Sequence, residues 1–483
     1  MLNVYDITDW VSAHPGGDVI LRAAGGSIDG YWDIFSIHKN QYVYDILDTY
    51  LIGYVDKVDL SLDGSRLAVA HDIEDPFSDD PVRHPDLITR TRKPRNAESP
   101  ACSIEDNFLT PNDLFYVRNH MWVPTVDQDP DDHRLTIELA DGSTKSYTLR
   151  ELKARFPKRT VTATLQCSGN RRAHMSEGSG RKANGLPWDV GAISNAVWEG
   201  VMLADILADA GFDPRSSQKD KDVKHVHFVG METYGSSIPI RKAMDPYGDV
   251  LLAWGMNGEP LPRDHGFPLR SIVPGNVAAR SVKWLQRIAL SDDESPAQWQ
   301  RRDYKCFGPN QTAVDWDSAP AIQEMPVQSA ITGVRLGHMR SNGKDDNGNA
   351  VKGHPISMSG YAFSGGGHGI VRVDVSLDNG HTWFQARLLD DGSDDGDDGH
   401  SNVVTNQPGQ SWSWKRWRFD GTVPQVTFHD SQDGRKCTHL VVKAIDDAYN
   451  TQPESYAATW NIRGNLTSAW HRLLVCTDCS SKS

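Results

Sequence analysis

The pattern of apolar residues changes along this chain in a way that no single fold explains. Residues 1–56 alternate short apolar runs with glycine-rich turns, whereas residues 84–321 mix strand-like runs such as "HVHFVG" with helical runs such as "SNAVWEGVMLADILADAG". From residue 322 onward, strand-length segments are separated by Gly, Asp and Asn turns, and "DNGHTW" is a strong hairpin signal. Since 483 residues are too many for one ordinary core, about three domains are expected.

We therefore predict a multidomain α+β protein with three folded units. The first is a small α+β domain over 1–56, the second a large mixed α+β domain over 84–321, and the third an immunoglobulin-like β-sandwich over 322–472. Residues 57–83 are rich in Asp, Ser and Pro and are predicted to form a linker, while residues 473–483 form a polar tail.

Charge and hydropathy narrow the classes of partner. The chain carries 50 Lys and Arg against 64 Asp and Glu, a net charge of −14. This charge argues against a nucleic-acid backbone or an anionic membrane surface as the main partner and leaves a basic protein partner open. No window approaches the roughly 18 to 20 apolar residues of a membrane helix. The first residues, "MLNVYDITDW", already resemble folded sequence, so we expect no targeting peptide in the chain as given.

Six cysteines are scattered over the chain, which is too sparse a pattern for a disulfide scaffold. Cys476 and Cys479 form a C-x-x-C pair in the polar tail. A zinc site needs a second cysteine pair or a histidine pair, and neither accompanies this one. A zinc or redox role for this pair is therefore the less favoured interpretation.

Two histidines frame an apolar stretch near the start of the chain. His14 precedes a Pro-Gly-Gly turn, and His38 follows "VILRAAGGSIDGYWDIF". Either histidine alone is more often a surface or structural residue, but together they can hold both faces of a haem, which leaves electron transfer rather than oxygen chemistry. Over nearly its whole length this segment resembles the cytochrome b5 family, which implies His14 and His38 as axial ligands of haem b. The family usually begins with a further strand and helix, so we expect either a truncated chain or weakened haem retention.

The stretch "TLQCSGNRRAHM" places Cys167 just before Arg171 and Arg172. An inert buried thiol is the ordinary state of a cysteine, but the Gly-Asn pair after it predicts an exposed turn, and adjacent positive charge favours the thiolate. A thiolate is both a nucleophile and a soft metal ligand. A nucleophile would need a nearby base, for which His174 is a candidate, although no protease or acyltransferase signature accompanies it. From these residues alone the alternatives stay open.

Basic residues recur in other strand or turn segments of the same block, namely "FYVRNH", "RDHGFPLRSIVPG" and "ARSVKWL". A cationic, hydrogen-bonding environment of this kind suits a phosphate-bearing cofactor and a small oxyanion. The alternative is a set of surface and capping charges, which is where most Arg and Lys residues lie.

From about residue 75 to 472, many segments resemble the sulfite oxidase family, including "DDPVRHPDL", "FYVRNH", "TLQCSGNRR", "MNGEPLPRDHGFPLR", "RSVKWL", "WQRRDYK" and "DSAPAIQEMPVQSAI". The order of haem domain, molybdenum domain and β-sandwich is that of the animal enzymes. Assimilatory nitrate reductases share the molybdenum core but carry haem and flavin modules after it. The resemblance therefore implies a molybdenum-dependent enzyme that oxidises sulfite to sulfate by oxygen-atom transfer.

The resemblance also implies roles for individual residues. Cys167 would be the protein ligand to molybdenum, whose other sulfur ligands come from the dithiolene of the molybdopterin. The implied anion pocket consists of Arg118, Arg172, Trp188, Tyr304 and Arg463, and Cys306 stands in "RRDYKC" where glycine is expected. The implied pterin contacts are Phe115, Tyr116, Val117, Arg118, Asn119, His120, His265, Arg270, Ser281, Val282 and Lys283, with an acidic contact near Glu232.

The resemblance also implies an electron acceptor, an oligomeric state and a compartment. Reoxidation would proceed in one-electron steps through the haem to cytochrome c, the C-terminal domain would form a homodimer, and the compartment would be the mitochondrial intermembrane space. The "RRDYK" motif with Tyr304 favours sulfite over nitrate. Two alternatives remain in competition: a nitrate-reducing relative, and a haem-binding or cofactor-binding protein without catalysis.

Overall fold

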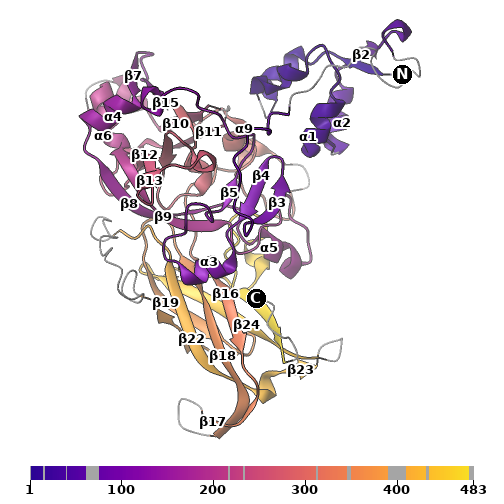
Figure 1. Ribbon diagram of the computed structural model, residues 1–483, viewed down its shortest axis with the longest axis vertical. Coiled ribbons are helices and arrows are strands. Elements are labelled where there is room, and N and C mark those ends of the chain that lie inside the picture. Colours follow the sequence, from indigo (N-terminus) through magenta and orange to yellow (C-terminus); the bar gives the residue numbers. More distant parts are fainter. Residues whose placement is uncertain are drawn as a thin grey trace.

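The computed structural model places the predicted blocks in three folded units (Figure 1). A small N-terminal unit lies beside the large middle unit, and a strand-rich C-terminal unit extends from the opposite end of the middle one. Glu232 and Cys479 lie outside the residues that the structure describes. The described residues are 2–14, 17–39, 41–60, 75–215, 218–231, 234–311, 314–344, 350–389, 410–430 and 435–477.

The N-terminal unit is closed by pairing of its two ends. Strand β1 (Asn3–Tyr5) runs antiparallel to β2 (Leu51–Tyr54), which brings the beginning and end of the unit together. Between them lie the helices α1 (Asp29–Ile34) and α2 (Gln41–Asp48) and several turns of 3-10 helix. His14 directly follows one of these 3-10 turns, and His38 lies within another, just after α1.

The large unit is built on two five-stranded sheets and a small third one. The first sheet has the order β11-β10-β15-β6-β7, the second has β13-β12-β9-β8 with β14 paired to β12, and β3-β4-β5 form the third. Strands β8 and β9 are buried along most of their length, as expected for strands covered on both faces. The strands are β3 (Ile88–Arg92), β4 (Arg95–Glu98), β5 (Val117–Arg118), β6 (Arg134–Glu138), β7 (Thr144–Thr148), β8 (Arg159–Gln166), β9 (Ile193–Met202), β10 (His225–Gly230), β11 (Gly235–Pro239), β12 (Leu251–Met256), β13 (Glu259–Pro260), β14 (Arg270–Ile272) and β15 (Leu285–Ser291).

Short helices connect the strands of this unit. Helix α4 begins with a capping box, in which Thr148 and Glu151 satisfy each other's backbone amides. Helix α6 ends at a glycine in the left-handed conformation, Gly211, which is a common helix stop. The helices are α3 (Ala101–Asp106), α4 (Leu149–Arg155), α5 (Arg172–Ser179), α6 (Leu203–Ala210), α7 (Gln218–Asp222), α8 (Ile240–Ala243) and α9 (Gln298–Arg301).

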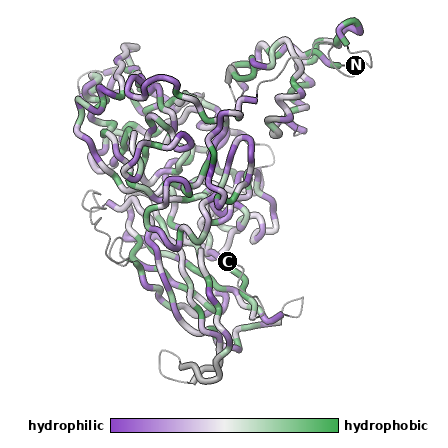
Figure 2. The backbone as a smooth tube through the Cα atoms, in the orientation of Figure 1, coloured by the Kyte–Doolittle hydropathy of each residue, from purple (hydrophilic) through white to green (hydrophobic). Residues whose placement is uncertain are grey.

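The C-terminal unit consists of two antiparallel sheets, which agrees with the predicted sandwich. One sheet has the order β16-β18-β22-β21 with β17 added to β18, and the other has β20-β19-β24-β23 with β25 added to β24. Hydrophobic and hydrophilic residues alternate along these strands (Figure 2), and the apolar side chains meet in one core. The strands are β16 (Gln328–Leu336), β17 (Arg340–Lys344), β18 (Ala350–Phe363), β19 (Ile370–Ser376), β20 (Phe384–Gln385), β21 (Arg387–Leu388), β22 (Lys415–Pro424), β23 (His429–Asp430), β24 (Lys436–Asp446) and β25 (His471–Cys476).

The hairpin predicted at "DNGHTW" is present. It joins β19 to β20, which pair antiparallel, and both Asn379 (φ 59°) and Gly380 (φ 95°) adopt the left-handed conformation. Asn and Gly tolerate this conformation better than other residues, which is why the pair marks a hairpin in sequence.

A disulfide that the sequence did not predict joins Cys437 on β24 to Cys476 on β25. The two cysteines are 39 residues apart in sequence but directly opposite in the strand register. The partner of Cys476 is therefore Cys437 on the neighbouring strand, and not the nearby cysteine of the C-x-x-C pair. Strand pairing, rather than spacing in sequence, selects the partner.

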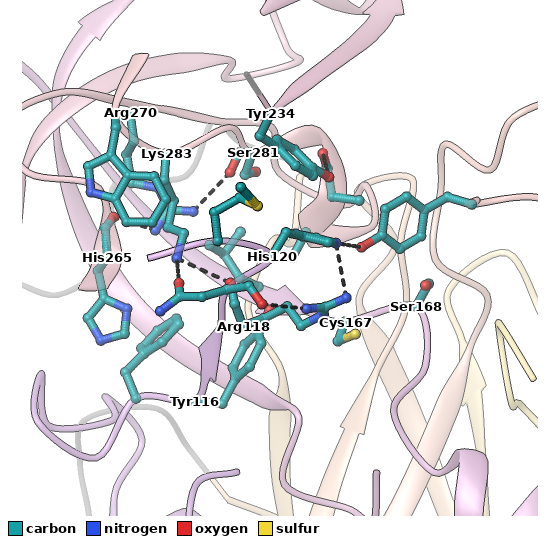
Figure 3. A pocket seen from close by; sticks show the side chains of 18 residues that line it. Tyr116, Arg118, His120, Cys167, Ser168, Tyr234, His265, Arg270, Ser281 and Lys283 are labelled. Atoms are coloured by element: carbon teal, nitrogen blue, oxygen red, sulfur yellow. Dashed lines mark hydrogen bonds between the residues drawn. The ribbon is translucent and has the colours of Figure 1, made fainter. Parts of the chain in front are cut away.

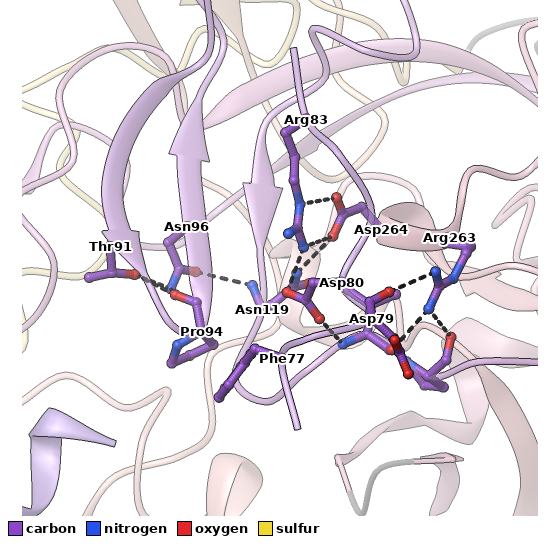
Figure 4. Close-up of polar contacts among 12 residues, drawn as sticks. Phe77, Asp79, Asp80, Arg83, Thr91, Pro94, Asn96, Asn119, Arg263 and Asp264 are labelled. Atoms are coloured by element: carbon purple, nitrogen blue, oxygen red, sulfur yellow. Dashed lines mark hydrogen bonds and ion pairs between the residues drawn. The ribbon is translucent and has the colours of Figure 1, made fainter. Parts of the chain in front are cut away.

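Residues 75–83, expected to belong to the linker, are packed on the large unit (Figure 4). Arg83 donates to Asp264 at 2.7 and 2.9 Å and to Asp80 at 2.9 Å, and Asp80 accepts from the backbone amide of Val123 at 2.8 Å. The buried ion pairs therefore attach this segment to the wall of the large unit. Within the described part of the chain, no helix is both long and apolar enough to cross a membrane.

Candidate active site

Cys167 lies at the end of β8, where the chain turns toward α5. Its backbone amide donates to the Ala192 carbonyl at 3.0 Å, and Asn170 in the turn donates to the Tyr361 hydroxyl at 2.8 Å. The turn was expected to be exposed, but Cys167 is only 6% exposed and Asn170 only 1%. The sulfur is therefore held in the interior, because the C-terminal unit packs over the turn.

The two arginines after the turn have different partners. Arg171, in the left-handed conformation (φ 64°), donates to the carbonyls of Ser329 at 3.1 Å and Ala469 at 2.8 Å in the C-terminal unit. Arg172 donates to the carbonyls of Leu186 at 2.9 Å and Arg463 at 2.8 Å. Burial lowers the pKa of Arg172 from its ordinary value. Arg171 thus joins two units, while Arg172 fixes backbone near the thiol.

Cys167 opens into a pocket of about 750 Å³, counting the space open to solvent (Figure 3). The pocket brings together segments that are far apart in sequence, at the junction of β5, β8, β14 and the turn before β15. Of the residues singled out from sequence, those that line it are Phe115, Tyr116, Arg118, Asn119, His120, Cys167, His265, Arg270, Ser281, Lys283 and Tyr304.

One nitrogen of His120 connects two of the expected anion-binding residues. Its Nε2 lies 3.0 Å from the Tyr304 hydroxyl and 3.0 Å from an Arg118 guanidinium nitrogen (Figure 3). Since arginine can only donate, Nε2 is the acceptor and the ring is neutral. Burial, together with the nearby cations, holds the pKa of His120 well below its ordinary value.

The donors on either side of His120 keep their protons. Burial raises the pKa of Tyr304 to about 12, so its hydroxyl remains a donor at neutral pH. Burial alone would lower the pKa of Arg118, but the neighbouring Tyr304 and Cys167 raise it above the ordinary value. The pocket therefore presents a hydroxyl and a guanidinium to any small anion that enters.

A second cationic group lies on another wall of the pocket. Arg270 donates to the carbonyls of His265 at 2.7 Å and Ser281 at 3.1 Å, and burial lowers its pKa to about 10. Lys283 donates to the Asp264 carbonyl at 2.8 Å and contacts Asn119. The hydrogen bonds found for Arg270 within the described residues all go to backbone carbonyls. A buried cation with neutral partners suits a phosphate or another anionic group.

Five residues expected at the site do not line the pocket. Trp188 is 1% exposed and packs in the same apolar cluster as Cys167. Arg463 forms an ion pair with Asp303, beside Tyr304. Arg172 bonds to backbone as described above, and Val117 and Val282 point into apolar clusters away from the pocket.

His174, the candidate base for Cys167, has other partners. Its Nε2 lies 2.8 Å from the Asp189 carboxylate, and its ring stacks on His471 with 4.8 Å between centroids. These contacts favour a structural role and leave no geometric support for a cysteine–histidine nucleophile.

Several pocket residues were not found from sequence. Tyr234 lines the pocket and stacks on His120, with 4.8 Å between ring centroids. Trp299, which is not among the lining residues, packs edge-on against His120 at 5.4 Å. The remaining lining residues are Met121, Leu165, Ser168, Ala278, Ala279 and Trp284. Tyr234 was part of no motif quoted above, whereas Met121, Ser168 and Trp284 directly follow residues that were chosen and could have been found from that adjacency. Trp299 is the first residue of the quoted segment "WQRRDYK".

The two N-terminal histidines form a second candidate site. Their ring centroids are 6.1 Å apart and their planes lie within 9° of parallel. Two metal–nitrogen bonds of about 2 Å, with about 1 Å from each nitrogen to its ring centre, would give about this separation. His38 Nδ1 lies 3.0 Å from the Phe35 carbonyl, so Nε2 would be the ring nitrogen that ligates a metal. The pair therefore fits one iron between two imidazoles.

Within the described residues, no group of three or more His, Cys, Asp or Glu side chains comes together to hold a metal ion. Cys167 can supply one ligand, so a metal bound there would take its other ligands from a cofactor or solvent.

Comparison with known proteins identifies the domains in which the two candidate sites lie. Models of three families match the chain: the cytochrome b5-like haem/steroid binding domain at residues 2–56, the oxidoreductase molybdopterin binding domain at 120–299, and the Mo-co oxidoreductase dimerisation domain at 319–478. Sulfite oxidase of Gallus gallus is 46% identical over 97% of this chain and 94% of that protein. The mitochondrial sulfite oxidase of Homo sapiens is 42% identical over 98% of this chain and 80% of that protein.

A solved structure shares the architecture. The sulfane dehydrogenase SoxCD from Paracoccus pantotrophus superposes with a TM-score of 0.61 at 25% identity, covering 88% of this chain and 98% of that one.

Proposed function

Because the chain belongs to the sulfite oxidase family, we propose that it oxidises sulfite to sulfate at a molybdenum cofactor and passes the electrons on through a haem. The observation that carries this proposal is the buried Cys167 thiol in a pocket lined by Arg118, Arg270 and Lys283. A soft ligand beside converging cations suits a soft metal, an anionic cofactor and an oxyanion substrate.

The residues present fit a molybdenum–pterin cofactor. Cys167 would ligate the metal, while the buried Arg270, whose hydrogen bonds go to carbonyls, would face an anionic part of the pterin. Lys283, His265 and Ser281 line the same wall. When bound, the cofactor supplies an oxygen atom to sulfite and takes up two electrons.

The chain's own residues would bind and orient sulfite. Arg118 and the protonated Tyr304 provide donors that can turn from His120 Nε2 to substrate oxygens. His120 stays neutral at this depth and therefore holds both donors without adding charge. Arg463 and Arg172 lie next to this group and would contribute positive potential as charge shifts during the reaction. Burial of these donors strengthens each hydrogen bond to the substrate.

Electrons would leave through the N-terminal unit. Conversion of one sulfite and one water to sulfate releases two electrons and two protons, and a haem held by His14 and His38 accepts electrons singly. We propose cytochrome c as the final acceptor, since the net charge of −14 is compatible with docking of a basic protein.

The relatives support the assembly and the compartment that we propose. The dimerisation domain matched at 319–478 supports a homodimer through the C-terminal unit. Relatives named as mitochondrial support a mitochondrial location, and we propose the intermembrane space, where cytochrome c is available.

Optical spectra of the purified chain before and after sulfite addition test the function. We expect sulfite, but not buffer alone, to convert the ferric haem spectrum to the ferrous one, and nitrate not to reoxidise it. Cys167→Ser should keep the haem spectrum but lose bound molybdenum and the response to sulfite, because a hydroxyl is a poor replacement for a soft thiolate. Cys102→Ser, at an exposed free cysteine, is the matched control. A Cys167→Ser protein that still responds to sulfite would contradict the assignment.

A further inference from the structure

The disulfide between Cys437 and Cys476 closes a covalent loop around a segment that reaches the candidate active site. The two cysteines are 39 residues apart in sequence. Arg463 and Asn465 lie inside this loop, and both accept hydrogen bonds from Arg172, the first through its carbonyl at 2.8 Å and the second through its side chain at 3.2 Å. The acceptors that hold an arginine beside the pocket are therefore part of a covalently closed loop.

The loop ends in β25, and the beginning of this strand contacts the helix that follows the cysteine turn. His471 Nδ1 accepts from the backbone amide of Ile331 at 2.9 Å, and its ring stacks on His174 of α5 with 4.8 Å between centroids. Just before the strand, the Ala469 carbonyl accepts from Arg171 at 2.8 Å. One end of β25 is therefore packed near the turn that carries the candidate metal ligand, and the disulfide closes the other end.

Strand β25 lies at the edge of its sheet. Among the described strands only β24 pairs with it, and its side chains Leu473 and Leu474 are 37% and 52% exposed. An edge strand opens more readily than a central one, because its backbone is hydrogen-bonded on one side only. The disulfide crosses from β24 to β25 and keeps this end of the strand closed.

Resting on the proposed function, we propose that Cys437 and Cys476 form a redox site, which a protein dithiol reduces to loosen the hold of the C-terminal unit on Arg172. A thiolate of the dithiol attacks one disulfide sulfur, the S–S bond breaks, and the other cysteine leaves as a thiolate and takes up a proton. The second thiol of the dithiol then attacks the mixed disulfide. The cysteine pair gains two electrons, and the dithiol becomes a disulfide.

Opening of β25 is the step that admits the dithiol. Cys437 is 6% exposed and Cys476 is 2% exposed, so the closed strand leaves an attacking thiolate little access to either sulfur. Opening this end of the strand breaks only its pairing with β24. Exchange is therefore slow but not blocked.

Reduction acts on substrate binding rather than on the metal ligand. Cys167 lies outside the covalent loop, and its backbone amide donates to the Ala192 carbonyl within the large unit. Arg172, in contrast, depends on two acceptors inside the loop. Opening the loop increases the conformational freedom of these acceptors. The reduced protein therefore binds sulfite more weakly and keeps its molybdenum.

Steady-state kinetics of the full-length holoenzyme before and after reduction test the proposal. Treatment with dithiothreitol, followed by its removal, should raise the KM for sulfite about fivefold and change kcat by less than about twofold. Reoxidation should restore the KM. The double variant Cys437→Val, Cys476→Val keeps apolar side chains on both strands, and it should show the raised KM without any response to dithiothreitol. Cys102→Ser, at an exposed free cysteine, should respond as wild type does.

Two further measurements on the same proteins do not depend on turnover. Mass spectrometry should find the Cys437–Cys476 crosslink in the untreated protein and lose it after reduction. Hydrogen exchange in residues 463–476 should become faster on reduction of wild type and not change when the double variant is treated. Absence of the crosslink, a KM that stays within about twofold after reduction, or a double variant that still responds would overturn the redox site. Untreated enzyme whose haem is not reduced by sulfite would instead overturn the proposed function.

Discussion

Asn465 connects the C-terminal unit to the residues around the thiol. Its Oδ1 accepts from the Ser168 hydroxyl at 2.9 Å and from Arg172 at 3.2 Å, and its Nδ2 donates to the Lys305 carbonyl at 3.3 Å. Asn465 is 2% exposed, so each of these partners depends on it rather than on water. One amide thereby holds Ser168, Arg172 and the chain segment that carries Tyr304.

Asn465→Ala should lower the free energy of unfolding by about 2 kcal/mol, because it leaves buried donors without an acceptor. It should also raise the KM for sulfite several-fold more than it changes kcat, because Arg172 loses its orientation. Asn465→Asp keeps the acceptor oxygen and should restore most of the KM. Urea unfolding and steady-state kinetics measure both effects. Asn107→Ala, at a half-buried amide remote from the pocket, serves as control, and a KM change as large in that variant would contradict the role.

Single residues differ in how far sequence could predict their positions. The motifs around Arg118, Cys167, Arg270 and Lys283 identified residues that the fold brings into one pocket. The sequence predicted an exposed turn at Cys167, because a Gly-Asn pair carries no information about which domain covers it. Tyr234 stacks on His120, and Trp299, the first residue of "WQRRDYK", packs against the edge of the same ring. Both contacts arise through tertiary packing, which no local pattern encodes.

At the level of elements, residues 75–83 are held by an ion pair with a defined pH dependence. Burial alone would raise the pKa of Asp264, but the hydrogen bonds and charge of Arg83 lower it below its ordinary value of 3.8. A lowered folded-state pKa means that this carboxylate stabilises the fold fully above that ordinary value. The contribution is lost as the pH falls through the lowered pKa.

Arg83→Gln should lower the free energy of unfolding by about 3 kcal/mol at pH 7, because Asp264 becomes a buried charge without its cation. The difference in the free energy of unfolding between variant and wild type should shrink below about pH 4, where Asp264 in the variant is protonated. Urea unfolding at several pH values measures this. Arg287→Gln, which breaks an exposed pair with Glu138, should show little change at any pH, and a difference for Arg83→Gln that grows with acid would contradict the argument.

Local sequence patterns predicted a structural element where the residues that determine it are adjacent in sequence. The Asn379–Gly380 turn was identified because its left-handed backbone favours those two residues. The Cys437–Cys476 disulfide was not, since its partners meet through the pairing of β24 with β25. The packing of residues 75–83 on the large unit was not predicted for a similar reason: Arg83 and Asp80 resemble solvated charges until the distant Asp264 is brought to them.

At the scale of the whole molecule, the change of apolar pattern along the sequence predicts three folded units. It does not predict how these units contact each other. Arg172, next to the pocket, is held across the junction between the middle and C-terminal units, because Asn465 and the Arg463 carbonyl of the C-terminal unit accept its hydrogen bonds. Arg171 lies at the same junction and is 0% exposed. The middle and C-terminal units are therefore expected to depend on each other for stability as well as for the site.

Arg171→Met should separate the unfolding of these two units. The side chain keeps its volume, but the carbonyls of Ser329 and Ala469 lose a charged donor, at a cost of about 2 kcal/mol or more for each bond. Calorimetry should then resolve a transition that is single in wild type into two, with sulfate formation lost at the lower one. Arg150→Met, at an arginine whose side chain is 58% exposed, should leave the transition unchanged. A single, merely shifted transition in Arg171→Met would mean that the junction is held mainly by its apolar contacts.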